Sequence, residues 1–245
     1  MPSPWTTVVI SPHFDDAALS LAGLLRRLDG PAAVATVHAA AAPAGSELSY
    51  WDSVCGFTST AETHRARLAE DARACALMRV DQVLLDHADG PYRDSEPLTS
   101  LTDFLAGLPL TTRVLLPLGT NQRDHRAVRD QGLAALAARP GADAADALRP
   151  WVYADLPYSG AADEWGTDQA SAALERSDRG SAYRDLKSRY RLDVVQDLHL
   201  TEEEWIAKRE AVLCYTSQLA PVAVDHKAFL RSPGPLQSEL VWELS

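Results

Sequence analysis

Three acid or base side chains stand within four residues near the start of the chain. His13, Asp15 and Asp16 follow the apolar run Val8-Val9-Ile10 and precede a leucine-rich segment, so a strand should end and a helix begin around them. Imidazole and carboxylate groups bind divalent cations and transfer protons. Because His13 and Asp16 are three residues apart across a turn, both could bind one cation while Asp15 points elsewhere.

A second histidine occupies an equivalent place later in the chain. His125 follows an apolar run at residues 113–118 and again stands where a helical pattern opens. With His13 and Asp16 it would complete a set of two imidazoles and one carboxylate, which leaves a fourth position for water and is typical of catalytic zinc. The simpler interpretation is that Asp15 and Asp16 only cap a helix and that His125 lies at the surface. The occurrence of two such groups at equivalent positions, each after a predicted strand, favours a metal site over this simpler interpretation.

Short β-branched runs alternate with longer helical patterns, which predicts one α/β domain with a mostly parallel sheet and helices on both faces. Ligands bind beyond the carboxyl ends of the strands in such sheets. Ser59 with Glu62, and Thr201 with Glu204, form predicted capping boxes. The polar, aperiodic residues 160–191 predict a mobile excursion outside the core. Strands are expected at 6–11, 34–38, 82–86, 113–118 and 151–154, and helices at 17–28, 59–78, 101–108, 124–138 and 201–217.

Composition narrows the classes of partner. The 245 residues carry a formal net charge of −11, which disfavours nucleic acid and anionic membranes as partners and leaves a small-molecule substrate. The three cysteines form no CxxC pair, and the N-terminus has neither a basic region nor a long apolar run. We therefore expect a cytoplasmic protein. The sequence leaves open whether the protein forms a homo-oligomer.

The motifs together resemble the PIG-L (LmbE-like) metal-dependent deacetylases. The resemblance rests first on Ser-Pro-His-Phe-Asp-Asp at 11–16 and on Asp-His-Arg-Ala-Val at 124–128. Weaker matches follow at 89–93, at 155–158 and between Lys208 and Gln218. The resemblance runs over most of the chain.

This resemblance implies a Rossmann-like fold and the hydrolysis of an N-acyl group, commonly an N-acetyl group on an amino sugar. It also implies one Zn²⁺ ion bound by His13, Asp16 and His125, with Asp15 as the general base. For substrate contact it indicates three polar side chains. These are Arg67, Asp89 and Arg93, although Arg67 could simply form a surface pair with Glu70.

One position departs from the family pattern. The family often has a histidine three residues before its last metal ligand, where it stabilises the oxyanion; here that residue is Gln122. A glutamine amide can donate a hydrogen bond but carries no positive charge and no transferable proton. His226 and His87 are candidates to compensate. His38, His64 and His199 are interpreted as structural or exposed, and Tyr158 and Tyr215 as core residues that could instead line a pocket.

Two other functions stay open at this stage. A non-hydrolytic binding or accessory protein with the same metal site would explain the loss of the oxyanion histidine. A nucleotide-binding α/β domain has little support, because no glycine-rich phosphate-binding motif follows the first strand.

Overall fold

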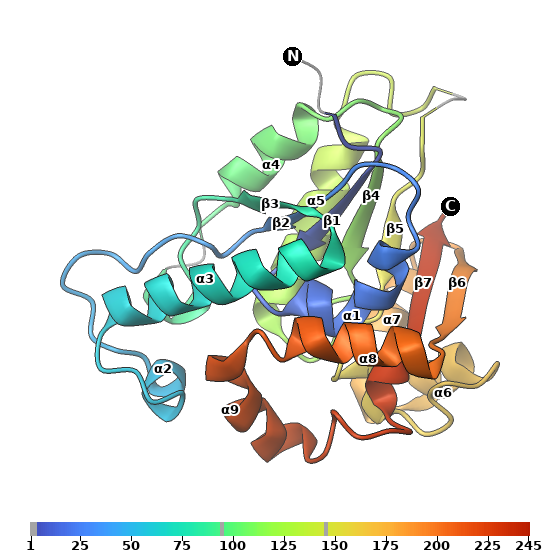
Figure 1. Ribbon diagram of the computed structural model, residues 1–245. Coiled ribbons are helices and arrows are strands. Elements are labelled where there is room, and N and C mark those ends of the chain that lie inside the picture. Colours follow the sequence, from blue (N-terminus) through green and yellow to red (C-terminus); the bar gives the residue numbers. More distant parts are fainter. Residues whose placement is uncertain (1–3, 94–95, 145–146) are drawn as a thin grey trace.

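In the residues that the computed structural model describes (4–93, 96–144 and 147–245), seven strands form one sheet in the order β3-β2-β1-β4-β5-β7-β6 (Figure 1). The expectation that no signal peptide is present rests partly on residues 1–3, which lie outside the described residues. The strands are β1 (Thr7–Ser11), β2 (Ala32–Thr36), β3 (Asp81–Leu84), β4 (Arg113–Pro117), β5 (Trp151–Tyr153), β6 (Leu192–His199) and β7 (Ser238–Leu244).

The first five strands are parallel, as predicted. β1 pairs with β2 on one side and β4 on the other, β2 with β3, and β4 with β5. The sheet is extended by β7, which runs antiparallel to β5, and by β6, which runs antiparallel to β7. Because β1 and β4 are neighbours and parallel, the loops that follow them leave the sheet side by side at its carboxyl edge.

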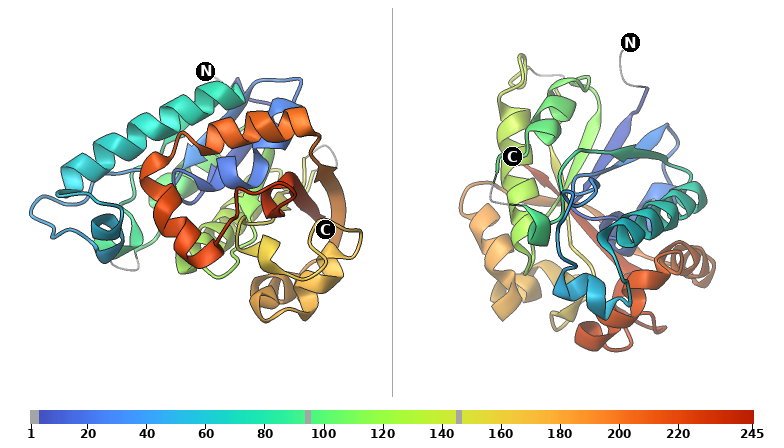
Figure 2. Two further views of the ribbon diagram at one scale, coloured as in Figure 1. Left: turned by 60° about the horizontal axis from the view of Figure 1, so that its bottom comes forward. Right: turned by 90° about the vertical axis from the view of Figure 1, so that its left-hand side faces the viewer.

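Helices cover both faces of the sheet, which confirms the predicted fold class (Figure 2). One face carries α4 (Thr99–Ala106), α5 (Arg123–Ala137), α6 (Ala170–Arg176) and α7 (Ser181–Lys187). The other carries α1 (Asp16–Arg26), α3 (Thr60–Met78) and α8 (Glu202–Val212). Two further helices, α2 (Tyr50–Val54) and α9 (Thr216–His226), follow a long loop and α8 respectively. Among the described residues, no helix is both long and apolar enough to cross a membrane.

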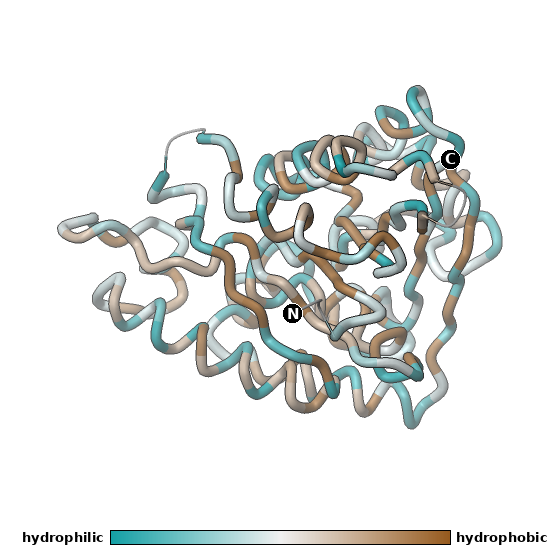
Figure 3. The backbone as a smooth tube through the Cα atoms, turned by 90° about the horizontal axis from the view of Figure 1, so that it is seen from above, coloured by the Kyte–Doolittle hydropathy of each residue, from teal (hydrophilic) through white to brown (hydrophobic). Residues whose placement is uncertain are grey.

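The central strands are buried on both sides, and successive side chains serve opposite cores. Val8 and Ile10 pack under α4 and α5, whereas Val9 between them packs under α1. This alternation is the two-residue period of a strand. Figure 3 shows hydrophobic stretches through the middle of the fold and hydrophilic ones along much of its outer loops. The carboxyl edge of the sheet is therefore supported by a packed hydrophobic core on each face.

Helix starts follow their predicted caps, with one difference. Thr201 and Glu204 form the full reciprocal capping box of α8. Ser59 accepts a hydrogen bond from the Glu62 N–H, but the Glu62 carboxylate bonds the backbone and hydroxyl of Thr58 instead of Ser59. The Ser59 cap is therefore present without the second half of its box.

Two expectations about the second half of the chain differ from the structure. Residues 160–191 contain α6 and α7, and their Leu174 and Leu186 are fully buried in the core, so the segment does not lie outside it. The helix expected over 201–217 ends at Val212, and α9 begins at Thr216. Tyr215 interrupts it because its backbone is not helical and its hydroxyl donates a buried hydrogen bond to Asp71 (2.7 Å).

Candidate active site

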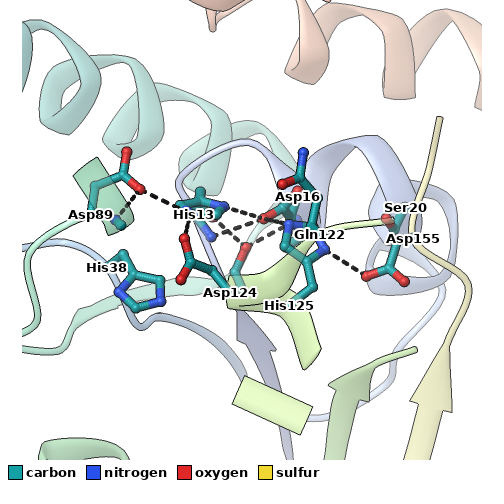
Figure 4. Close-up of polar contacts among 12 residues, drawn as sticks. His13, Asp16, Ser20, His38, Asp89, Gln122, Asp124, His125 and Asp155 are labelled. Carbon is teal, nitrogen blue, oxygen red and sulfur yellow. Dashed lines mark hydrogen bonds and ion pairs between the residues drawn. The ribbon is translucent and has the colours of Figure 1, made fainter. Parts of the chain in front are cut away.

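Two loops at the carboxyl edge bring the three expected ligands together (Figure 4). His13 follows β1, Asp16 begins α1, and His125 lies in the first turn of α5. Candidate ligand atoms of the three side chains lie within 4.8 Å of one another. Asp16 Oδ2 is 3.3 Å from His13 Nδ1 and 3.2 Å from His125 Nε2. The three groups are close enough to bind one cation.

The turn after β4 has a backbone that only glycine fills easily. Gly119 has a φ of 86°, and a Cβ atom there would lie 2.8 Å from the Arg126 side chain and 3.1 Å from its Cα atom. This close approach folds the start of α5 back onto the end of β4. His125 is thereby fixed over the β1 loop and is buried, with 1% of its surface exposed.

A residue without a predicted role, Asp155, orients His125. Its Oδ1 atom lies 2.8 Å from His125 Nδ1, and its Oδ2 atom accepts the Thr120 N–H at 2.8 Å. A carboxylate at this distance accepts the Nδ1 proton, so Nε2, which faces Asp16, is the atom left to bind a cation. A carboxylate behind a histidine is the usual support of a metal ligand. In the sequence, the only indication of a role for Asp155 was its position just after a predicted strand, at the edge of the sheet where ligands bind.

His13 uses its two ring nitrogens in different directions. Nδ1 faces Asp16, while Nε2 lies 3.2 Å from Asp89 Oδ1 and 3.6 Å from Asp124 Oδ2. Asp89 can accept the Nε2 proton and Asp124 adds negative charge beside it, so Nδ1, on the side of Asp16, is the atom left to bind a cation. Both imidazoles of the cluster are thus turned towards the same point.

The electrostatics of the cluster favour an added positive charge. Burial alone lowers the pKa of His125, but Asp16 and Asp155 raise it to about 9. Burial also opposes protonation of His13, yet the carboxylates around it, Asp89 first, raise its pKa well above the ordinary value. The attraction of the buried carboxylates for a positive charge therefore exceeds the free-energy cost of burying that charge. The donor set and this charge balance both fit a divalent metal ion.

Asp15 occupies the N-cap position of α1 but does not cap the helix with its side chain. It precedes α1, but its side chain makes no capping hydrogen bond, and Asp16 instead accepts the backbone N–H of His13 at 2.8 Å. Burial, reinforced by the charge of Asp16, raises the pKa of Asp15 to about 6. A carboxylate with this pKa is largely ionised at neutral pH and can accept a proton. The interpretation of the two aspartates as mere caps is therefore wrong.

A cavity of about 300 Å³ opens beside the cluster and contains most of the expected substrate residues. Arg67 and Asp89 line it, with the Arg67 guanidinium bonded to the buried Asp52. Arg93 is absent from the lining; its guanidinium instead donates to Asp124 Oδ1 at 2.7 Å. Other lining residues include Asp15, Trp51, Tyr92, Gln122, Tyr158 and Gln218.

Arg67 and Glu70 do not form the surface pair that was the simpler interpretation. Arg67 bonds Asp52, while the buried Glu70 accepts from the hydroxyls of Thr216 and Ser217 at 2.9 and 2.7 Å. The two side chains therefore tie α3 to α2 and to α9 respectively. Both helices contribute to the cavity, through Trp51 of α2 and Gln218 and Val222 of α9.

Gln122 stands at the edge of the same cavity and contacts Tyr158. Its Nε2 atom donates to the Tyr158 hydroxyl at 3.1 Å. The Tyr158 ring lies edge-on to His125, with ring centroids 5.8 Å apart, and to His226, with centroids 5.0 Å apart. Tyr158 therefore lines the cavity instead of filling core. Burial raises its pKa, so its hydroxyl is neutral at physiological pH.

The remaining histidines divide into two groups. His38 and His64 line the cavity, which the sequence did not predict; each bonds a backbone carbonyl at 3.0 Å, that of Ala88 and of Ala39 respectively. His87 and His226 do not line it, and His199 is exposed on β6. Neither candidate for replacing the oxyanion histidine therefore reaches the cavity wall directly.

Comparison with known proteins identifies a family to which the chain belongs. The family model described as PIG-L, GlcNAc-PI de-N-acetylase, matches residues 8–136, a stretch that includes His13, Asp15, Asp16 and His125. No curated protein matches the chain.

Solved structures of similar fold cover almost the whole chain. A triple mutant of a deacetylase of the teicoplanin biosynthetic pathway is 22% identical, with a TM-score of 0.72 over 98% of this chain and 97% of the other. The A40926 pseudoaglycone deacetylase is 22% identical, with a TM-score of 0.69 over 99% and 98%. The zinc-inhibited form of a teicoplanin deacetylase is 20% identical, with a TM-score of 0.70 over 98% and 97%. At these identities the likeness establishes a shared fold.

Proposed function

Because the chain belongs to the PIG-L family of GlcNAc-PI de-N-acetylases, we propose that it is a metal-dependent amidohydrolase. Its substrate is an N-acylated, in the first place N-acetylated, amino sugar, glycoside or related small metabolite. The observation that carries this proposal is the convergence of His13, Asp16 and His125 beside a cavity that also contains Asp15. The deacetylases of similar fold support the choice of reaction.

In this proposal His13, Asp16 and His125 hold one zinc ion per chain. When bound, such a cation supplies Lewis acidity, which makes water more acidic and an amide carbonyl more electrophilic. Asp155 keeps the Nε2 lone pair of His125 turned inwards, and Asp89 and Asp124 do the same for Nδ1 of His13. A related deacetylase has a zinc-inhibited form, so the metal must be identified by reconstitution with several cations.

Asp15 transfers the proton in this reaction. It accepts a proton from water as the water oxygen bonds to the amide carbon, giving a tetrahedral intermediate. The same proton then passes to the amide nitrogen as the carbon–nitrogen bond breaks, so that a free amine and acetic acid leave, the latter ionising to acetate in solution. Asp15 suits this role because it lines the cavity and is engaged in no capping hydrogen bond.

The substrate roles expected from the sequence divide in two. Asp89 and Arg67 line the cavity and are proposed to bond hydroxyl groups of a sugar ring. Arg93 is proposed to act indirectly, because it holds Asp124, which faces His13. A cavity of about 300 Å³ suits a single sugar unit with its acyl group, the rest of a larger glycoside lying outside.

The compartment proposed for the protein is the cytoplasm. Cys55, Cys75 and Cys214 are all unpaired in the structure, which suits a reducing environment. The alternative function, non-hydrolytic binding, is not favoured, because the three structures compared above are described as deacetylases.

Acetate release from a panel of substrates tests the proposed function. The panel contains N-acetylglucosamine glycosides, N,N'-diacetylchitobiose and an acylated A40926 pseudoaglycone, each assayed with protein reloaded with zinc, cobalt, manganese or iron. We expect one acetate and one free amine per molecule turned over for at least one substrate. Saturable binding without acetate release under every metal would contradict hydrolysis and support a binding protein.

A further inference from the structure

The hydroxyl of Tyr158 accepts a hydrogen bond from Gln122. The Gln122 amide nitrogen is the donor and the phenolic oxygen the acceptor, at 3.1 Å. A phenol carries one proton of its own, which this contact does not use. Among the residues that the structure describes, no other hydrogen bond of the Tyr158 hydroxyl is seen. Its proton is therefore available to a ligand in the cavity that Tyr158 lines.

The ring of Tyr158 is fixed in place by two histidines. The edge-on contact with His125, at 5.8 Å between centroids, ties the ring to one candidate metal ligand, and the contact with His226, at 5.0 Å, supports it from α9. Aromatic contacts of this geometry restrict ring orientation. The hydroxyl therefore has two independent constraints, ring packing and the Gln122 amide. Such preorganisation is what an oxyanion donor requires, since a donor that must reorient loses most of its advantage.

We propose that Tyr158 is a catalytic residue of the deacetylation, donating its hydroxyl hydrogen bond to the oxygen of the tetrahedral intermediate. Gln122 is then a positioning residue: it orients the Tyr158 hydroxyl and does not itself replace the family's histidine. His226 acts on the same group from behind. This inference rests on the proposed function and concerns only how the oxyanion is stabilised.

Three variants separate this role from a structural one. Tyr158→Phe removes the donor and keeps the ring that packs against His125. Gln122→Met removes the amide and keeps the length of the side chain. The matched control is Tyr215→Phe, which loses a buried hydroxyl hydrogen bond to Asp71 outside the cavity. Metal content is measured in every variant, so that a disturbed His125 cannot imitate a lost donor.

Tyr158→Phe is expected to lower kcat on the order of 10²-fold with KM almost unchanged, as for loss of one oxyanion donor. Gln122→Met is expected to lower kcat in the native background and to have no further effect when Tyr158 is already Phe, because positioning residues act through their partner. Tyr215→Phe should keep kcat. A Tyr158→Phe variant with full metal content and kcat within about twofold of the native enzyme would overturn the proposal, as would an undiminished effect of Gln122→Met in the Tyr158→Phe background.

A binding measurement distinguishes failure of this inference from failure of the proposed function. The probe is a methylphosphonamidate of glucosamine, a tetrahedral analogue, compared with N-acetylglucosamine by calorimetry. Native protein should bind the phosphonamidate more tightly, and Tyr158→Phe should lose most of that preference. If native protein shows neither the preference nor acetate release, the proposed function fails. If native protein shows both and Tyr158→Phe keeps both, only the assignment of Tyr158 is wrong.

Discussion

The carboxylate of Asp155 bonds Nδ1 of His125 at 2.8 Å from the side opposite to Asp16, so that β5 fixes the tautomer of a residue that α5 supplies. Its second oxygen accepts the Thr120 N–H from the turn after β4. One buried side chain thus joins the strand end, the turn and the candidate ligand.

Asp155→Asn should therefore weaken metal binding without unfolding the protein. An asparagine can accept from either His125 or Thr120, but its NH₂ group opposes the other donor. We expect metal affinity to fall about 10- to 100-fold, as for loss of other carboxylates behind histidine ligands. Competition with a chelator measures it, with the exposed Asp163→Asn as control. Equal affinity in native protein and Asp155→Asn would show that Asp155 does not support the ligand.

Asp15→Asn should separate catalysis from metal binding. The side chain makes no capping hydrogen bond, so helix α1 and the ligand Asp16 should stay in place. Without a base, kcat should fall by at least about 10²-fold while metal content is retained. Elemental analysis and acetate release on the same preparation provide the two readouts. An unchanged rate would remove Asp15 from the mechanism.

Lys208 should matter for stability and not for chemistry. Lys208 Nζ and Glu239 Oε1 are 2.7 Å apart, and both side chains are fully buried between α8, α1 and β7. Lys208→Met removes the ionic partner of the buried Glu239, whose carboxylate then keeps only the backbone N–H groups of Gly23 and Leu24; this should lower the free energy of unfolding by about 3–5 kcal/mol. Arg27→Met, which breaks the more exposed pair with Glu204, should cost less than about 1 kcal/mol. Denaturant titration compares them; equal costs would contradict this.

Asp71 should make stability depend on pH between about 4 and 6. Burial raises the pKa of its carboxyl to about 6, above the ordinary value of 3.8, so the folded protein holds this proton more tightly than the unfolded chain. Its contribution is therefore most favourable below about pH 4 and declines as pH rises through about 6, by about 3 kcal/mol. Asp71→Asn should show a shallower decline than native protein, since Asp15 keeps its own raised pKa, whereas the exposed Asp163→Asn should match native protein. Parallel declines in native protein and Asp71→Asn would refute the assignment.

Local sequence patterns were enough to predict the two segments of the site that bear the candidate metal ligands. The β1 loop and the start of α5 each combine an apolar run with polar residues at its end, and the parallel pairing of β1 with β4 brings them together. The sequence alone was therefore enough to predict His13, Asp16 and His125 as neighbours. The expected strands and helices shift by a few residues at their ends, because propensity weakens there.

The remaining features depend on tertiary contacts that no local pattern encodes. Asp155 reaches His125 only when β5 pairs with β4, and Tyr158 contacts His226 only when α9 packs beside it. Strand β6 was missed because it is an edge strand without a single buried residue, so its apolar and polar side chains follow no clear two-residue period. Arg93 was expected at the substrate because its bond to Asp124, thirty-one residues away, is invisible in sequence.

The most direct test counts tightly bound divalent metal ions per chain by elemental analysis after exhaustive dialysis. Native protein should retain about one ion, while His13→Ala, Asp16→Ala and His125→Ala should each retain almost none and the exposed His199→Ala should retain the native amount. A native count near zero after reloading, or a full count in His125→Ala, would show that the two loops do not share one cation.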